Sequence, residues 1–288
     1  MGRITARRPV VRIRMDGPDG PASSRRPDAL AVEEPLEIRI GGAALTVTMR
    51  TPGHDVELAT GFLVSEGVVR RADDVRAAIH CGGPGTGGEE NTYNVLDLSL
   101  AHAVDVAPLV RAFPTTSACG VCGTASIAQV QARAPFDVAA DPVRIPAALL
   151  AGIPDRLRAR QDVFAQTGGL HAAALVEVGT GDIVVVREDV GRHNAVDKVV
   201  GWAAARGLLP LAGHVLAVSG RASFELVQKA AMAGIPALAA VSAPSSLAVE
   251  LAADRGITLV GFLRGATMNA YAGAERIVVS GPAAAGPA

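Results

Sequence analysis

The amino-acid sequence predicts an α/β protein, with a three-layer mixed sheet in its C-terminal part and a smaller α+β unit before it. From about residue 170 onward, continuous apolar runs alternate with helical segments that are followed by Gly. Uninterrupted apolar strands are typical of a parallel sheet that helices cover on both faces. A hairpin followed by alternating helices and strands then gives a mixed sheet between two helical layers.

The chain divides into four segments. Residues 1–30 are rich in Arg, Pro, Asp and Gly, and they predict a partly ordered tail with at most one short strand, near Val10–Ile13. Residues 31–112 predict the small α+β unit, and residues 113–146 carry a Cys-x-x-Cys loop and a helix. Residues 147–281 predict the larger α/β domain.

In the small unit, strands over 36–40 and 44–49 with Gly41-Gly42 between them predict a hairpin. A helix is expected from Asp55 to a stop at Glu66-Gly67. The rest of the unit is expected to contain a helix or turn, a Gly-rich loop and a strand, over residues 73–79, 82–88 and 93–98.

The larger segments predict helices near residues 125–133 and 155–166, then a hairpin with strands over 170–178 and 183–187. Three further helices are expected over residues 194–205, 222–233 and 245–254. The strands that follow them are expected over residues 214–218, 235–241 and 257–262.

Composition excludes several classes of function. The 288 residues are 49% hydrophobic, with a mean hydropathy of +0.31, so the chain can build a large core. With 27 basic and 28 acidic residues, no broad field favours nucleic acid or an acidic membrane surface. Only nine residues are aromatic (one Trp, two Tyr and six Phe), which argues against base-stacking platforms. We therefore expect neither nucleic acid nor a membrane as a partner.

The three cysteines, at positions 81, 119 and 122, are too few for a disulfide-stapled secreted protein, so a reducing, cytoplasmic compartment is expected. Cys119 and Cys122 form a Cys-x-x-Cys just before a predicted helix, whose N-terminus lowers the pKa of a nearby thiol. Cys81 is expected to be an incidental loop thiol.

Three chemistries fit the Cys-x-x-Cys. It can be half of a zinc site, although a second such pair is absent. It can be a redox dithiol, although it does not follow a clear strand of a βαβ unit. It can transfer sulfur: one thiolate attacks the outer sulfur of a persulfide and carries it, and the second thiol can resolve the adduct. A purely structural role, in which Cys119 and Cys122 are two buried small residues, is disfavoured because their neighbours are Gly, Ser and Thr.

Polar residues follow four predicted strands at their carboxyl ends, where open α/β sheets bind ligands. They are Glu188, Asp189, Arg192, His193 and Asn194; Ser219, Gly220 and Arg221; Ser242, Ser245 and Ser246; Leu263, Arg264 and Gly265. Three of the junctions begin a helix, whose free N–H groups favour an anion, and the Arg side chains can donate paired hydrogen bonds to phosphate. The alternative is ordinary helix caps and surface Arg. Together, the junctions favour an anionic, nucleotide-like ligand.

Other polar residues are ambiguous. His193 either orients a ligand, acts as an acid or base, or only hydrogen-bonds at a helix start. His171 is expected to be a structural histidine. Asp197 and Lys198 are interpreted as a pair on a helix surface, and Glu225 and Lys229, four residues apart, are expected on one stripe of their helix.

A zinc-dependent deaminase is a further alternative, because the predicted sheet is compatible with that fold. Such enzymes use His-x-Glu at one helix start and Pro-Cys-x-x-Cys at the next. This chain has His193-Asn194-Ala195 and Ser219-Gly220-Arg221 there, so the zinc chemistry is missing and no metal is expected.

Several motifs together resemble the formate dehydrogenase accessory sulfurtransferase family. The resemblance covers about residues 35–277 and includes several long motifs in the same order. The motifs span residues 119–123, 167–172, 187–198, 219–225 and 242–246. The resemblance implies a cytoplasmic, homodimeric sulfur carrier whose C-terminal domain is similar to cytidine deaminase. A non-catalytic chaperone of the molybdenum cofactor is the alternative.

The resemblance also implies partners and site residues. Sulfur would come from a cysteine desulfurase and pass to the bis-guanine-dinucleotide molybdenum cofactor for formate dehydrogenase, and GDP would mimic that cofactor. Cys119 would bear the persulfide and Cys122 would assist it. The cofactor-binding segment would comprise Phe262, Leu263, Arg264, Gly265, Ala266 and Thr267. Because Ala266-Thr267 replaces a second basic residue, Arg221 or Arg192 must supply more phosphate contacts.

Overall fold

The structure, a computed structural model, describes residues 4–16, 20–81, 93–104 and 134–279. Cys119 and Cys122 lie outside the described residues, as do the expected loop over 82–88 and the expected helix over 125–133. No helix of the described part is long and apolar enough to span a membrane.

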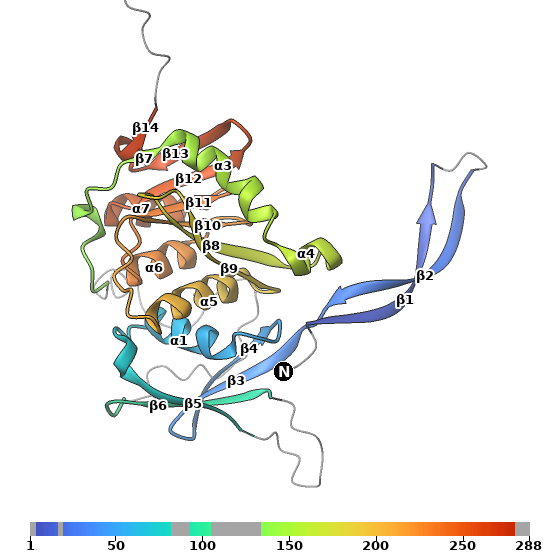
Figure 1. Ribbon diagram of the computed structural model, residues 1–288, viewed down its shortest axis with the longest axis horizontal. Coiled ribbons are helices and arrows are strands. Elements are labelled where there is room, and N and C mark those ends of the chain that lie inside the picture. The colour runs from blue at the N-terminus through green and yellow to red at the C-terminus, as the bar shows by residue number, and fades with distance from the viewer. Residues whose placement is uncertain (1–3, 17–19, 82–92, 105–133, 280–288) are drawn as a thin grey trace, which may run out of the picture.

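The C-terminal part is built on a six-stranded mixed sheet, in the order β13-β12-β11-β10-β8-β9 (Figure 1). The strands are β8 His171–Glu177, β9 Ile183–Asp189, β10 His214–Val218, β11 Ala237–Ala240, β12 Thr258–Arg264 and β13 Thr267–Ala272. β10, β11 and β12 are parallel to one another, whereas β8 runs antiparallel to both β9 and β10. The predicted mixed sheet is confirmed, and β13 is an additional edge strand, antiparallel to β12.

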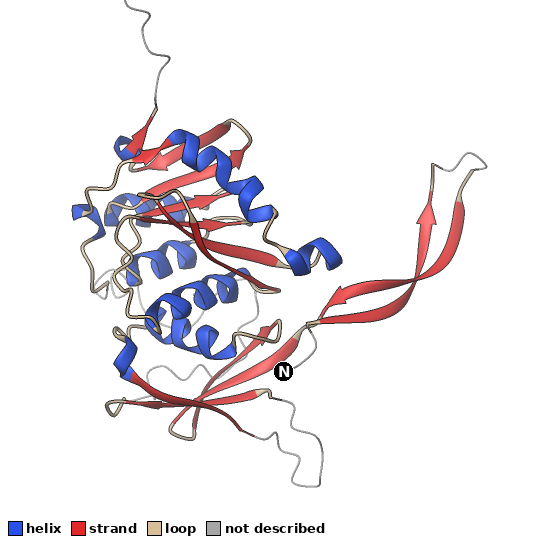
Figure 2. Cartoon of the chain, viewed as in Figure 1, coloured by secondary structure: helices blue, strands red, loops and turns tan. Residues whose placement is uncertain are grey.

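Helices cover both faces of this sheet and make three layers (Figure 2). The helices on one face are α5 Arg192–Ala204, α6 Phe224–Met232 and α7 Ser246–Arg255. The other face packs on α3, Ala147–Arg158. Because side chains alternate along a strand, Leu216 and Val218 of β10 face the first helical layer, and Val215 and Ala217 face α3. The central strands are therefore buried on both sides.

The single helix expected over 155–166 is two helices, α3 and α4 Asp162–Thr167. The break has a tertiary cause. The carboxylate of Glu188, on β9, accepts the N–H groups of Val163 and Phe164 at 3.0 and 2.8 Å. A carboxylate that satisfies the free N–H groups of a first turn starts a new helix there. The spacing of apolar residues over 155–166 does not reveal this cap, because Glu188 lies more than twenty residues further along the chain.

The small unit contains a four-stranded sheet in the order β4-β3-β6-β5. Its strands are β3 Glu34–Ile40, β4 Ala43–Arg50, β5 Val75–Cys81 and β6 Val95–Leu100. The β3–β4 hairpin is confirmed. The stretch over 73–79 is neither a full helix nor only a turn. The Asp74 carboxylate accepts the N–H groups of Arg70 and Arg71, one 3₁₀ turn follows, and β5 then pairs with β6.

Helix α1, Asp55–Ser65, lies between the two sheets and packs on α5 (Figure 1). Both helices carry a glycine where their backbones meet. A Cβ on Gly201 would overlap the carbonyl of Glu57, and one on Gly61 would overlap that of Asp197. One hydrophobic cluster includes Leu36 of the small sheet and Leu216 of the large one. The small unit and the large domain therefore share a core.

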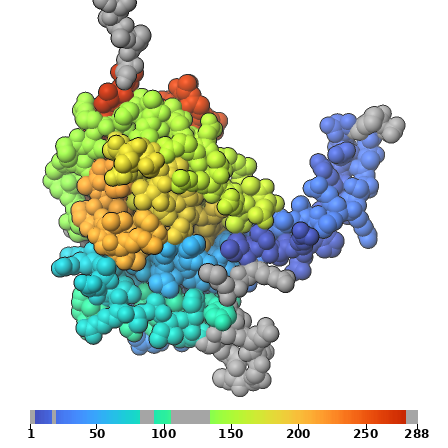
Figure 3. Space-filling model, in the orientation of Figure 1, coloured from blue at the N-terminus to red at the C-terminus, as the bar shows by residue number. Residues whose placement is uncertain are grey.

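The N-terminal segment forms a long two-stranded ribbon, which corrects the expected tail with at most one short strand. β1 Thr5–Arg14 and β2 Ala22–Ala31 pair antiparallel, and the ribbon projects from the body (Figure 3). Val10 lies opposite Arg26, and Ile13 lies opposite Ser23. Because most of its side chains face solvent, the ribbon lacks the buried apolar face on which strand prediction depends.

The remaining elements are short. They are η1 Ala72–Asp74, η2 Val138–Ala140, β7 Ile145–Pro146, η3 Ala274–Arg276 and β14 Ile277–Val278. The buried Arg276 side chain donates to the carbonyls of Val138, Ala139 and Gly256, between 2.6 and 3.0 Å. These bonds hold the C-terminal part against the segment that precedes α3.

The close approach of α1 and α5 yields a stability prediction. Gly201→Ala is expected to lower the free energy of unfolding by about 3 kcal/mol, because the new methyl group meets backbone rather than a movable side chain. Denaturant unfolding measures this change. Gly152→Ala in α3 is the matched control, since its Cβ would only touch Arg156, and it is expected to stabilise by roughly 0.5–1 kcal/mol. Equal effects of the two variants would contradict the prediction.

Candidate functional site at the strand edge

The four predicted junctions meet at one edge of the main sheet. β9, β10, β11 and β12 all end there, while β8 and β13 begin there. Helices α5, α6 and α7 start at the same edge. The spatial convergence expected from the sequence is therefore confirmed, whereas the ligand that it would bind remains a prediction.

The junction after β10 joins the central strand to β8 and leaves a hydroxyl proton free. The Ser219 hydroxyl oxygen accepts the N–H of Ala172 at 2.9 Å, and the Ser219 N–H donates to the Ala172 carbonyl at 2.9 Å. A Cβ on Gly220 would lie 3.4 Å from Nδ1 of His171, so the loop passes close to that ring. Arg221 is exposed beyond it. The Ser219 hydroxyl can still donate to a ligand.

The junction after β11 supports the capping alternative for one residue. Ser245 is the N-cap of α7, and its hydroxyl accepts the N–H of Ala248 at 3.3 Å. Its side chain is exposed at the edge. Capping therefore explains Ser245 without a ligand, and a ligand contact stays a prediction.

The segment expected to bind the cofactor is the end of β12 and a hairpin turn, not the end of a last strand. Phe262 is exposed and has a φ of +51°, a strained conformation for a bulky residue. The prediction that Leu263 contacts the cofactor is corrected for its side chain. That side chain is 1% exposed and packs in the core on the α3 side, so it does not face a ligand at the edge. The residues of the turn, Arg264, Gly265, Ala266 and Thr267, are all exposed.

The junction after β9 depends on a buried ion pair. Asp189 is fully buried and accepts hydrogen bonds from the Thr51 N–H (3.1 Å), the Gly191 N–H (2.8 Å) and the Asn194 amide (3.0 Å). Lys198 lies 2.7 Å from it. Lys198 is therefore not on an exposed helix face, contrary to the prediction. It is buried because its charge is paired and hydrogen-bonded, including to the Thr51 carbonyl at 2.9 Å.

The pairing predicted for Asp197 is also wrong. Asp197 accepts two hydrogen bonds from Lys229 of α6, at 2.7 and 2.9 Å, and one from Ser65 of α1, at 3.0 Å. Burial raises the pKa of Asp197, while the Lys229 charge and its hydrogen bonds oppose the rise. Lys229 thus joins α6 to α5 rather than pairing with Glu225.

Glu225 pairs instead with His193, a partner that the sequence did not reveal. Nε2 of His193 lies 2.6 Å from Oε2 of Glu225 and 3.3 Å from Oγ of Ser223. The hydrogen bond from His193 lowers the pKa of Glu225, although burial opposes it, and the charges of Lys229 and Arg192 add to the lowering. His193 is therefore held at the helix starts by an ionised carboxylate.

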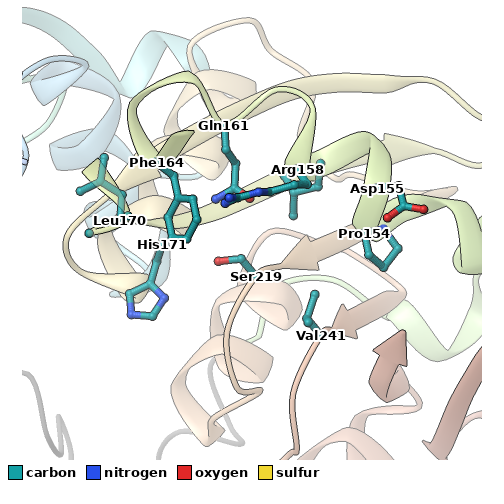
Figure 4. Close-up of a pocket in the computed structure, with 12 residues that line it drawn as sticks. Pro154, Asp155, Arg158, Gln161, Phe164, Leu170, His171, Ser219 and Val241 are labelled. Atoms are coloured by element: carbon teal, nitrogen blue, oxygen red, sulfur yellow. The ribbon is translucent and has the colours of Figure 1, made fainter. Parts of the chain in front are cut away.

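A pocket of about 570 Å³ opens at the same edge, on the α3 side of the sheet (Figure 4). Of the predicted site residues, only Ser219 is among its lining residues. His171, which was expected to be a structural histidine, also lines the pocket. Burial lowers the pKa of His171, as do the positive charges of Arg192 and His193, so a neutral ring is favoured. The lining residues are Pro154, Asp155, Leu157, Arg158, Gln161, Phe164, Gly168, Gly169, Leu170, His171, Ser219 and Val241.

The cysteines and metal ligands complete the comparison with the sequence. Cys81 is the last residue of β5 and is partly exposed, so it is a strand residue rather than a loop thiol. Cys119 and Cys122 lie outside the described residues and stay predictions. The described residues contain no group of three or more His, Cys, Asp or Glu that could hold a metal.

Another ion pair fixes β9 to α1 and yields a pH prediction. Arg187 donates to the Glu57 carboxylate at 2.6 and 2.9 Å. Burial would raise the pKa of Glu57, but the hydrogen bonds from Arg187 and His54 lower it from 4.5 to about 2. Because the folded pKa is the lower one, this stabilisation is complete above about pH 4.5 and is lost as the pH falls towards 2.

Glu57→Gln is therefore expected to flatten the acid limb of the stability curve between pH 4.5 and about 2. The stability that the wild-type chain loses in this window through Glu57 is about 1 kcal/mol, because solvent screens a partly exposed ion pair and the full pKa shift overstates its contribution. Chemical denaturation at a series of pH values measures it. Glu250→Gln, at an exposed position on α7, is the control. An unchanged acid limb in Glu57→Gln would contradict the prediction.

This chain is similar to known proteins over almost its whole length. The model of the FdhD/NarQ family matches residues 31–278. The sulfur carrier protein FdhD of Streptomyces avermitilis is 59% identical, over 99% of this chain and 100% of that protein. The protein of the same name from Mycobacterium tuberculosis is 56% identical, over 96% of this chain and 100% of that protein.

A solved structure shows the same fold. It is the crystal structure of a formate dehydrogenase accessory protein from Desulfotalea psychrophila, with a TM-score of 0.73. The match covers 96% of this chain and 100% of that chain, at 24% identity. The N-terminal ribbon, apart from its last residue Ala31, precedes the residues that the family model matches.

Proposed function

The chain belongs to the FdhD/NarQ family, and from this premise we propose that it is a sulfur carrier and an accessory protein of formate dehydrogenase. Relatives that bear the name sulfur carrier protein are 56–59% identical over nearly the full length, which supports the proposal. The single structural observation that carries it furthest is the strand edge, where exposed Arg221 and Arg264 stand beside three helix starts.

Sulfur transfer is proposed to run through Cys119. Its thiolate attacks the outer sulfur of a persulfide on a cysteine desulfurase, a new S–S bond forms, and the desulfurase thiolate leaves. Cys119 then carries the persulfide. Attack of the Cys122 thiolate on the inner sulfur would form a Cys119–Cys122 disulfide and release the outer sulfur as sulfide, so no external oxidant is needed.

The acceptor is proposed to be the bis-guanine-dinucleotide molybdenum cofactor, bound as a substrate at the strand edge. Its diphosphates suit Arg221 and Arg264, the free Ser219 hydroxyl and the N–H groups at the start of α6. His193, fixed by Glu225, and Arg192 lie at the start of the neighbouring α5. The proposal includes a homodimer in the cytoplasm and a cytidine-deaminase-like C-terminal sheet.

The assignment of Cys119 has a direct test. Purified Cys119→Ala is expected to gain no sulfur when incubated with a cysteine desulfurase and cysteine, because the attacking thiolate is missing. Intact-mass spectrometry detects the added sulfur atom on the wild-type chain. Cys81→Ala is the matched control and is expected to load normally. Full loading of Cys119→Ala would refute the assignment, and transfer of no labelled sulfur by the wild-type chain in a single turnover would favour a non-catalytic chaperone.

The nucleotide site has a separate test. GDP is expected to bind the wild-type chain, and Arg221→Ala and Arg264→Ala are each expected to weaken binding roughly tenfold, about 1.4 kcal/mol. Isothermal titration calorimetry measures the affinities. Arg255→Ala is the control, since Arg255 ends α7 at the opposite end of the sheet. Unchanged affinity in both edge variants would exclude this site.

A further inference from the structure

The N-terminal ribbon carries a positive charge that no described carboxylate neutralises. Its two strands contain a single acidic residue, Asp28, and six arginines, whose side chains are all exposed. None of the six forms an ion pair with another residue of the described part. They are Arg7, Arg8, Arg12, Arg14, Arg25 and Arg26. A long projection with an uncompensated charge fits a partner of the opposite charge (Figure 1).

The two faces of the ribbon differ. Because side chains alternate along a strand, Val11 and Ile13 lie on one face, where they are 56% and 67% exposed. Four of the arginines lie on the opposite face: Arg8, Arg12, Arg14 and Arg26. Protein interfaces combine apolar surface with arginine, whereas a phosphate backbone would leave the two aliphatic side chains in water. The ribbon therefore fits a protein partner better than a nucleic acid.

The edges of the ribbon are unsuited to pairing with a further strand. Pro9 lies opposite Pro27 in the middle of the ribbon. Neither residue has an N–H group, so each edge lacks a donor at this point, and a strand added to either edge would be interrupted there. A partner must therefore recognise the side chains of the ribbon rather than extend its sheet.

The base of the ribbon lies beside the strand-edge site. β2 packs on α4, and a Cβ on Gly169, which follows α4, would lie 3.6 Å from that of Ala31, the last residue of β2. Gly169 and Phe164 of α4 line the pocket at the strand edge. A protein held along the ribbon is consequently brought next to the edge where the substrate is proposed to bind.

We propose that the ribbon is a docking arm for formate dehydrogenase in its cofactor-free form. The inference rests on the proposed function and deepens it, because it assigns the surface that receives the acceptor enzyme. Of the two proposed protein partners, the enzyme that takes up the cofactor has to approach the strand edge, whereas the sulfur donor has to reach Cys119. The arginines meet carboxylates on the enzyme, and Val11 and Ile13 enter a shallow apolar depression between those carboxylates.

Binding of purified, cofactor-free formate dehydrogenase to the full chain tests the charged contacts, with biolayer interferometry as the measurement. The double variant Arg12→Gln/Arg26→Gln is expected to weaken binding about tenfold, because it removes two contacts between exposed charges that are each modest alone. The matched control is Arg76→Gln/Arg144→Gln, which changes the net charge equally at exposed positions outside the ribbon and is expected to bind normally. Since salt screens exposed charges, the difference between the two double variants is expected to shrink at high salt.

A second pair of variants tests the apolar contacts. Ile13→Thr keeps a β-branched side chain in the strand but makes it polar, and it is expected to weaken binding about fivefold. Ile79→Thr makes the same change on β5, where the side chain is 62% exposed, and is expected to have no effect. Circular dichroism checks that each variant keeps its fold. GDP binding and sulfur loading are expected to stay unchanged in every ribbon variant.

The outcomes are distinct. Weaker binding in both ribbon variants, with both controls unchanged, supports the inference. If the ribbon variants bind the enzyme as tightly as the wild-type chain, the accessory function stands and the docking arm is overturned. It is also overturned if they alter only self-association in sedimentation, or only binding to a cysteine desulfurase, duplex DNA or anionic lipid vesicles. No binding by the wild-type chain overturns it too, and GDP binding and sulfur loading then show whether the proposed function survives.

Discussion

The buried pair of Asp189 and Lys198 is the interaction on which the rest of the site depends. Asp189 ends β9, Lys198 lies in the second turn of α5, and both bind the backbone of Thr51, just before α1. Three elements from distant parts of the chain thus meet at one ion pair. Removing one partner of such a pair leaves a buried charge, at a cost of about 3–5 kcal/mol. The pair therefore fixes the strand edge and joins the two sheets.

A second buried pair sets the helix starts relative to each other. Asp197 binds Lys229 of α6 and Ser65 of α1, where the glycines let α1 approach α5 closely. With α5 and α6 locked together, their first turns cannot slide independently. His193 at the start of α5 and Glu225 at the start of α6 are consequently held 2.6 Å apart. The geometry of the edge is thus set in the core behind it, which is an arrangement that preorganises a binding site.

The sequence predicted the elements whose signal is local and missed those whose cause is distant. Helices α5 to α7 and strands β10 to β12 carry strong periodicity and Gly stops, so their existence and common edge were predictable. The break between α3 and α4 depends on Glu188, far along the chain, and the ribbon depends on pairing without an apolar face. Lys198 was assigned to a solvated face because a charge on a helix is usually exposed, and only its partner Asp189 explains its burial. The pocket was also not predicted, because its lining residues come from segments that are distant in the sequence, from Pro154 to Val241.

The near-zero net charge of the chain does not exclude a local binding site for an anion, because a few basic side chains can gather at one edge while the total stays balanced. A broad basic surface would attract any polyanion, whereas here the exposed Arg221 and Arg264 lie at one edge of the sheet. Salt largely screens exposed charges that are more than about 8–10 Å apart, whereas it screens buried pairs much less. These two arginines can therefore govern encounter with the diphosphate of the proposed substrate. Charged groups at an exposed edge set the rate of encounter and the choice of partner more than the affinity, so the buried pairs behind the edge, which fix its geometry, have the larger part in holding a bound ligand.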